Sequence, residues 1–384
     1  MALFSRRSAF ELSPNRVTLA LERARAEGVP LLDLTTSNPT LAGIPYAPGV
    51  ADALSRSPDV LRYEPLPFGL PTARAAVSAL FRERGIVVPV EHVALTASTS
   101  EAYAFAFKLL CDPGDEVLVP APSYPLFEHL AALESVRLVP YRLGFDGAWF
   151  IDTAEVKRAV TPRTRAVVVV SPNNPTGSYL KREELARLVE LGLPLVSDEV
   201  FAEYPFGADP RRAASVLEAS EGLVLCLDGL SKVAALPQLK LGWMVLGGES
   251  SLVRTALARL ELVLDTFLSP GTPVQRALPE LLASRSVAAG AIRARLATNR
   301  AALERRVQGS ALTLLPAEGG WYAVLRMPAT LTDEEWTLRA LERGVAVQPG
   351  YFFDFDREPH LIVSLLTPEA TLSEGAERLA LLVS

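Results

Sequence analysis

The sequence predicts an α/β protein in which a large domain holds a mostly parallel seven-stranded sheet between helices, with a smaller α+β domain beside it. Three observations support this prediction. Short apolar runs rich in Val and Leu alternate with amphipathic helical stretches through the middle of the chain. A long Ala-, Arg- and Leu-rich stretch then precedes a second group of apolar runs. The chain has 384 residues, 49% of them hydrophobic, which is enough for a large core and two domains.

Seven apolar runs are the expected strands of the large domain, which we assign to residues 46–275. In chain order they are "HVALTAS", "DEVLVPAPSY", "VRLVPYRL", "RAVVVVSPNNPTG", "PLVSDEVF", "LVLCLDGLS" and "LGWMVLGG". Helical stretches such as "SEAYAFAFKLL" and "KREELARLVELG" lie between several of them. Because the strands are continuously apolar, we expect helices on both faces of the sheet.

The small domain is assigned to residues 276–384 together with 1–45. It begins with a long helix through "AAGAIRARLATNRAALERRVQG". The expected elements after it are "LTLLPAEGGWYAVLRMP", a helix in "DEEWTLRALERG", and the apolar runs "VAVQPGYFF" and "HLIVSLL". A helix around residues 14–28 is expected to join this domain from the N-terminal side.

The composition excludes several classes of function. The net charge is −6 and the charged residues are interspersed, so we expect no nucleic-acid partner. The chain lacks an apolar run of transmembrane length and a signal-peptide core, which predicts a cytoplasmic protein without a membrane partner. Cys111 and Cys226 lie in apolar stretches and fit a reducing compartment. The scattered His92, His129 and His360 predict no metal site.

Polar residues follow several expected strands, at the carboxyl edge where doubly wound sheets bind ligands. The amides of Ser98, Thr99 and Ser100 open a helix and could hold an anion, although an ordinary N-cap beside Glu101 explains the same residues. Asn174 lies in the Pro-braced "SPNNPTG", which could equally be a plain turn.

A lysine and a carboxylate follow two more of these strands. Asp198 comes directly after "PLV", where an unpaired carboxylate is costly to bury, so it either caps a helix or meets a cation. The chain has only five lysines, and Lys232 and Lys240 lie within nine positions of each other. Unlike arginine, lysine can lose its proton at neutral pH and form an imine. An imine-forming lysine, an acid for a pyridine nitrogen and an anion cradle together predict a pyridoxal 5′-phosphate site.

The order of these motifs resembles that of the class I/II aminotransferases of the fold type I pyridoxal phosphate enzymes, the aspartate aminotransferase superfamily. The resemblance covers nearly the whole chain and rests on "SNPT", "RYEPLPFGLPTAR", "TASTSEA", "PGDEVLVPAPSYPLF", "SPNNPTG", "SDEVF", "LSK", "LGW" and "VQPGYFF". It implies an enzyme that moves an amino group between a small amine or amino acid and a keto acid.

The resemblance also implies a role for each site residue. Lys232 forms the internal aldimine and moves the proton at the substrate carbon. Asp198 pairs with the pyridine N–H, and Asn174 hydrogen-bonds O3′ of the cofactor and contacts the substrate. Tyr124 stacks on the ring, although core packing is an alternative. The phosphate is held by Ser98, Thr99, Ser100, Ser231 and Lys240.

Two further implications concern the loop over the substrate and the oligomer. Ser37 and Asn38 lie in the loop over the substrate. Tyr63 reaches the phosphate in the site of a neighbouring subunit, which implies a homodimer.

Three positions depart from the family pattern. Lys240 replaces the usual phosphate-binding Arg, and Phe201 replaces a Tyr that donates to O3′. Ile362 occupies the position of the Arg that binds the substrate carboxylate. Either the substrate has no carboxylate there, or the alignment slips locally, or another cation substitutes. The candidates for such a cation are His360, Arg326, Arg6, Arg7 and Arg16.

Two other functions remain open at this point. A lyase, decarboxylase or racemase of the same fold would use the same cofactor and break a different bond. A ligand-sensing or scaffold protein on this fold would need no chemistry. The joint presence of Lys232, Asp198 and Asn174 argues against the second alternative.

Overall fold

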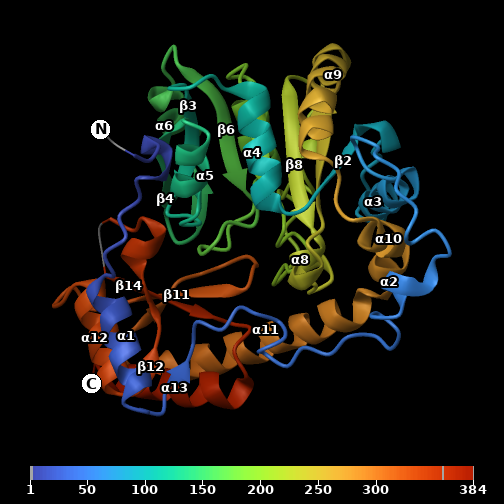
Figure 1. Cartoon of the computed structure of the whole chain (residues 1–384). Coiled ribbons are helices and arrows are strands. Elements are labelled where there is room, and N and C mark those ends of the chain that lie inside the picture. The colour runs from blue at the N-terminus through green and yellow to red at the C-terminus, as the bar shows by residue number, and fades with distance from the viewer. Residues whose placement is uncertain (1–2, 357–358, 384) are drawn as a thin grey trace.

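A computed structural model describes residues 3–356 and 359–383 (Figure 1). Figure 1 shows a large sheet in the upper part of the molecule and a smaller one below it, with the long helix α11 (Ser286–Val307) running along the lower side. Within the described residues, no helix combines the length and the apolar character needed to cross a bilayer.

The large sheet contains the seven expected strands and one more. Its strand order is β2-β9-β8-β7-β6-β3-β4-β5. The strands are β2 (Val93–Thr96), β3 (Glu116–Ala121), β4 (Arg137–Phe145), β5 (Trp149–Ile151), β6 (Thr164–Val170), β7 (Leu195–Asp198), β8 (Leu223–Gly229) and β9 (Gly242–Gly248). Strands β8, β7, β6, β3 and β4 pair in parallel, while β9 is antiparallel to β8 and β2, and the short β5 is antiparallel to β4.

Helices cover both faces of this sheet, as its apolar strands require. Alternate residues of β6 divide between two apolar clusters, with Val167 and Val169 in one and Val168 and Val170 in the other. The first cluster includes residues of α3 (Pro71–Glu83), α6 (Thr153–Ala159), α7 (Arg182–Val189) and α10 (Thr272–Ser284). The second includes residues of α4 (Thr99–Leu110), α5 (Phe127–Leu133) and α9 (Ser250–Phe267).

The N-terminal and C-terminal parts of the chain pack together, because Leu32 and Asp33 of β1 pair in parallel with Val345 and Ala346 of β12. A four-stranded sheet lies beside them in the order β10 (Thr313–Leu314), β11 (Tyr322–Arg326), β14 (His360–Ser364) and β13 (Gln348–Pro349). Its helices are α1 (Arg16–Ala26), α11, α12 (Asp333–Glu342) and α13 (Glu369–Leu381). Helix α10 packs on α3 and on α2 (Ala53–Arg56) of the large part. The exact domain boundary at residue 275 stays a prediction.

The remaining elements are short helical turns. They are the one-turn helix α8 (Leu230–Val233) and the 3-10 helices η1 (Arg6–Ser8), η2 (Val90–His92), η3 (Val216–Glu218), η4 (Pro237–Leu239) and η5 (Gly350–Phe353).

Candidate active site

The carboxyl edge of the large sheet brings Lys232 and Asp198 into one site. Asp198 is the last residue of β7, and Lys232 lies on α8, which begins directly after β8. Because β7 and β8 are parallel neighbours, their carboxyl ends meet at the same edge.

Aromatic rings surround the amine of Lys232. Its Nζ lies 5.1 Å from the ring centroid of Trp321 and 5.6 Å from that of Phe201. Burial lowers the pKa of Lys232, and the charge of Asp198 opposes this shift. A lowered pKa increases the fraction of neutral amine, which is the nucleophilic form.

Two glycines allow the lysine segment and the start of α4 to approach each other. A Cβ on Gly229 would lie 2.9 Å from Cα of Gly242, and a Cβ on Gly242 would lie 3.0 Å from the backbone carbon of Ser98. These positions are therefore close backbone contacts between β8, β9 and the segment that carries Ser98.

Asp198 is a buried carboxyl group, and two neutral groups donate hydrogen bonds to it. Its Oδ2 accepts a hydrogen bond from the Tyr103 hydroxyl at 3.3 Å, and its Oδ1 accepts one from the Val200 amide at 3.2 Å. Burial raises the pKa of Asp198 to about 6, while these two hydrogen bonds and the charge of Lys232 oppose the shift. A cationic ligand group placed here would keep the carboxylate ionised.

The two asparagines of "SPNNPTG" behave differently. The Asn173 amide donates to the Pro122 carbonyl at 3.0 Å, and its Oδ1 accepts from the Ser123 hydroxyl at 2.9 Å. Asn173 therefore braces the loop that leads to Tyr124. Asn174 is buried as well, yet its Oδ1 has no hydrogen-bond partner. A buried amide with an unsatisfied oxygen fits a ligand site better than a plain turn.

Tyr124 is not part of the core, because 38% of its surface is exposed. Its ring meets Phe127 edge to face at 6.1 Å. Burial of the hydroxyl raises the pKa of Tyr124, and the charge of Asp198 adds to the shift. The phenol thus lies within electrostatic range of Asp198 and has a partly open ring.

The predicted phosphate residues lie at the start of α4 and before β9. Ser98 is the N-cap of α4, because its Oγ accepts a hydrogen bond from the Glu101 amide at 3.1 Å. The side chain of Ser98 therefore has the ordinary N-cap role that was the alternative to anion binding. Thr99 and Ser100 form the first turn of α4, and Ser231 lies on α8 beside Lys232. Lys240 is exposed and has a left-handed backbone, two residues before Gly242.

The remaining predicted residues lie in loops. Ser37 is hydrogen-bonded to Tyr322, whose ring centroid is 6.2 Å from that of Phe201. Asn38 is exposed, and its Oδ1 accepts from the Thr40 amide at 2.9 Å. Tyr63 is 72% exposed and lines a surface pocket that includes neither Lys232 nor Asp198.

Sequence reasoning missed three aromatic residues of this site. Tyr103 donates to Asp198, Trp321 lies beside Lys232, and the Tyr204 hydroxyl donates to the Lys232 carbonyl at 2.5 Å. Tyr103 could have been found, because it lies one helical turn after Thr99 on the face that follows the expected anion site.

The departures from the family pattern have clear surroundings. Phe201 meets Trp321 edge to face at 5.3 Å and offers no hydroxyl. Ile362 is fully buried on β14, opposite Val324 of β11, in an apolar cluster with Leu315 and Phe353. The structure therefore provides an apolar environment at position 362.

This environment predicts the effect of restoring the usual residue. We expect Ile362→Arg to lower the free energy of unfolding by about 3–5 kcal/mol, because a guanidinium would replace a buried apolar side chain without a partner. Ile362→Val is the control and should cost about 1 kcal/mol. Urea unfolding measures both. An arginine variant as stable as the valine variant would contradict the expectation and indicate that the side chain reaches solvent or the site.

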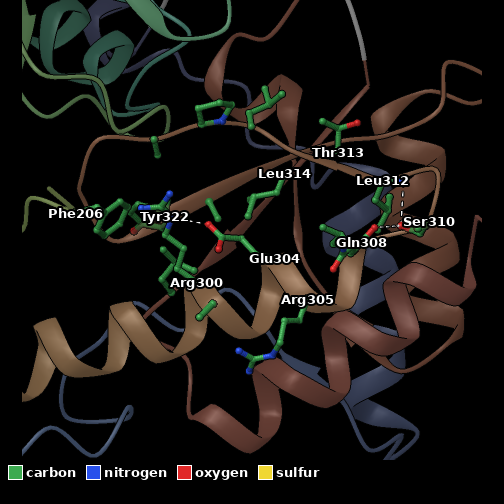
Figure 2. A pocket seen from close by; sticks show the side chains of 18 residues that line it. Phe206, Arg300, Glu304, Arg305, Gln308, Ser310, Leu312, Thr313, Leu314 and Tyr322 are labelled. Atoms are coloured by element: carbon green, nitrogen blue, oxygen red, sulfur yellow. Dashed lines mark hydrogen bonds and ion pairs between the residues drawn. The ribbon is translucent and has the colours of Figure 1, made fainter.

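A pocket that also includes Tyr322 is lined otherwise by different residues. It has a volume of about 700 Å³ and is formed by α11, β10 and the segments that flank them (Figure 2). Figure 2 shows Arg300 and Glu304 of α11 pointing into it, and they form an ion pair of 3.1 Å. Arg300 also lies over the Phe206 ring at 4.9 Å. None of the predicted site residues lines this pocket.

Comparisons with known proteins agree with the fold and the motifs. The glutamate-pyruvate aminotransferase AlaA of Escherichia coli is 31% identical over 267 residues, which are 68% of this chain and 65% of that protein. The aspartate/prephenate aminotransferase of Thermus thermophilus is 29% identical over 369 residues, 93% of this chain and 92% of that one. The structure of an alanine aminotransferase from Pyrococcus furiosus matches with a TM-score of 0.87 and 25% identity, over 99% of both chains.

The extent of these matches differs. The chain spans about two thirds of the length of AlaA, 65%, whereas a single family model, that of aminotransferase class I and II, matches residues 30–379. That match includes both sheets and the whole carboxyl edge where Lys232 and Asp198 meet, and so the chain belongs to the class I and II aminotransferase family.

Proposed function

We propose that this protein is a pyridoxal 5′-phosphate-dependent aminotransferase, which moves an amino group between an amino acid or amine and a keto acid. The observation that carries the proposal is that Lys232, a half-buried lysine whose pKa is lowered by burial, lies at the same sheet edge as the buried carboxyl group of Asp198. The unsatisfied Oδ1 of Asn174 and the close glycine contacts beside Ser98 also fit a bound cofactor.

The residues would divide the work of binding and proton transfer. Lys232 would bind the cofactor covalently and then accept and return the proton at the substrate carbon. Asp198 would keep the ring nitrogen protonated, Asn174 would donate to the ring oxygen, and Tyr124 would cover one ring face. When bound, the cofactor supplies an electron-withdrawing ring that stabilises the negative charge left on the substrate carbon. The phosphate would be held by Ser98, Thr99, Ser100, Ser231 and Lys240.

Amino acids are the substrate class we favour, since the named relatives are alanine, glutamate-pyruvate and aspartate/prephenate aminotransferases. Because position 362 is an isoleucine, a cation from another position would have to bind the carboxylate of an amino acid substrate. Arg16 pairs with Glu334 at 2.8 Å, and the Arg7 guanidinium donates to the Leu133 carbonyl at 3.5 Å. Arg326 lies on the same face of β11 as Val324, the partner of Ile362, and is one candidate.

A labelling experiment tests the function. The protein loaded with cofactor is mixed with ¹⁵N-labelled alanine, glutamate, aspartate or a primary amine and with a keto acid from a different donor. We expect the label in the amino acid formed from the keto acid. Loss of carbon dioxide or racemisation of the donor without label transfer would favour the lyase, decarboxylase or racemase alternative, and no reaction with any donor would favour a binding protein.

A homodimer is part of the proposal. Tyr63 lines one surface pocket together with Leu66 and Leu268, and all three side chains are exposed. Such a surface is typical of an interface and would bring Tyr63 to the neighbouring site. Sedimentation velocity would test the assembly, and a monomer at micromolar concentration would rule it out.

The two free thiols, Cys111 and Cys226, support a cytoplasmic location, which cell fractionation would check.

A further inference from the structure

We propose that Arg84 is a positioning residue for Lys232 and that it acts through the backbone of α8. This inference rests on the proposed function and adds to it what holds the reactive lysine in place. Arg84 is the C-cap residue of α3, and its guanidinium donates to Asp228 near the carboxyl end of β8.

The guanidinium of Arg84 bridges two carboxylates. Its Nη2 lies 3.0 Å from Oδ2 of Asp228 and 3.2 Å from Oε1 of Glu203, and its Nε also donates to Glu203 at 3.2 Å. The Asp228 side chain is fully buried, and those of Arg84 and Glu203 are 14% and 15% exposed. A planar group with donors in a fixed fork holds two carboxylates in one defined relation.

Asp228 connects this bridge to the start of α8. It is the next-to-last residue of β8, and its Oδ1 accepts a hydrogen bond from the Gly229 amide at 2.7 Å. This bond orients the peptide at which the strand turns into the helix. Lys232 follows three residues later, so a change in the turn moves its side chain.

Glu203 connects the bridge to the lysine residue itself. Its neighbour Tyr204 is buried and donates its hydroxyl to the Lys232 carbonyl. The Tyr204 ring also meets Trp321 edge to face at 5.3 Å, and the Trp321 ring centroid lies 5.1 Å from Nζ of Lys232. Arg84 thus holds α8 at its start through Asp228 and at Lys232 through the Glu203 segment.

The network reaches the long helix as well. Nη1 of Arg293 on α11 lies 3.9 Å from Oε2 of Glu203 and donates to the Glu203 carbonyl at 3.5 Å. Figure 1 shows α11 running below α8. The position of Lys232 is therefore coupled to helices from both parts of the molecule.

The test is Arg84→Lys in the cofactor-loaded enzyme. Lysine keeps the charge but cannot bridge both carboxylates with a planar fork. We expect kcat to fall by about 10²-fold, because a small misplacement of a reacting group has an effect of this size. KM for the amino donor should change little. We also expect slower trapping of the cofactor on Lys232 by borohydride, which is followed by mass spectrometry. Asp228→Asn should change both measurements in the same direction, and it decides the question if Arg84→Lys does not fold.

Glu116→Gln is the matched control. Glu116 is a buried carboxylate at the amino end of β3, far along the sheet from Lys232, and it pairs with Arg163 at 3.3 Å. The Glu116→Gln variant should be less stable than the parent but keep the parental kcat and trapping rate. If Arg84→Lys and Asp228→Asn also keep both, or lose kcat only as much as Glu116→Gln, Arg84 has a structural role and the inference is wrong. Absence of trapped cofactor in the parent would instead contradict the proposed function.

Discussion

Lys232→Arg is expected to abolish covalent cofactor binding and to lower kcat by about 10⁴-fold or more. The guanidinium keeps the positive charge, but it stays protonated at neutral pH and can neither form the imine nor exchange a proton with the substrate carbon. The lysine of the parent can lose its proton more easily, because burial beside Trp321 and Phe201 lowers the pKa of its amine.

Three measurements on Lys232→Arg separate chemistry from folding. Borohydride reduction followed by mass spectrometry should find cofactor on the parent chain and none on the variant. Label transfer should be lost, while the thermal unfolding midpoint should change little, because both side chains carry an apolar stem and a cationic end. Appreciable label transfer by the variant would show that another residue performs the reaction.

Asp198→Asn is expected to lower activity and raise stability in the protein without cofactor. Burial raises the pKa of Asp198 to about 6, from an ordinary value of 3.8. Below pH 4 the group is protonated in both the folded and the unfolded chain and resembles asparagine. As the pH rises from 4 to 6, the unfolded chain releases this proton before the folded one, so ionisation favours unfolding.

The shift of about two pH units corresponds to about 3 kcal/mol. At pH 7 the Asn variant should therefore be about 3 kcal/mol more stable than the cofactor-free parent, and the two should be equal below pH 4. Urea unfolding as a function of pH measures this difference. Subtracting the variant from the parent removes the contributions of titrating groups distant from Asp198, which both proteins share.

Activity should change in the opposite direction. With an amide at position 198 the ring nitrogen loses the anion that keeps it protonated, and kcat should fall by about 10²-fold or more. A parent whose stability does not fall between pH 4 and 6 relative to the variant would contradict the burial argument. Unchanged kcat in the variant would contradict the role of Asp198.

Much of the fold could be predicted because its signals are local. Apolar strands of four to nine residues alternate with helical stretches, and each of the seven runs forms a strand. The short β5 was missed, since Trp149–Ile151 has only three residues and pairs at the edge of the sheet. A strand of this length is determined by its partner, β4, more than by its own pattern.

The site could be predicted where a functional residue directly follows an apolar strand. Asp198 and Lys232 each follow an apolar run directly, and parallel pairing then brings them together. Asn174 was ambiguous in the sequence, where a turn explains it equally well. Only its burial and the unsatisfied Oδ1 distinguish it from Asn173, whose amide is fully used in bracing the neighbouring loop.

The sequence by itself therefore determined the strand and helix pattern, the order of the motifs and the residue types that suit an imine-forming site. Tertiary structure alone decided what surrounds them. Arg84, Glu203 and Asp228 are distant in sequence, and no periodicity relates them, yet the Arg84 guanidinium pairs with both carboxylates. Likewise the sequence shows that residue 362 is an apolar isoleucine, but its burial opposite Val324 follows from the register of the strands. Contacts of this kind depend on how elements pack, and packing is a property of the whole chain.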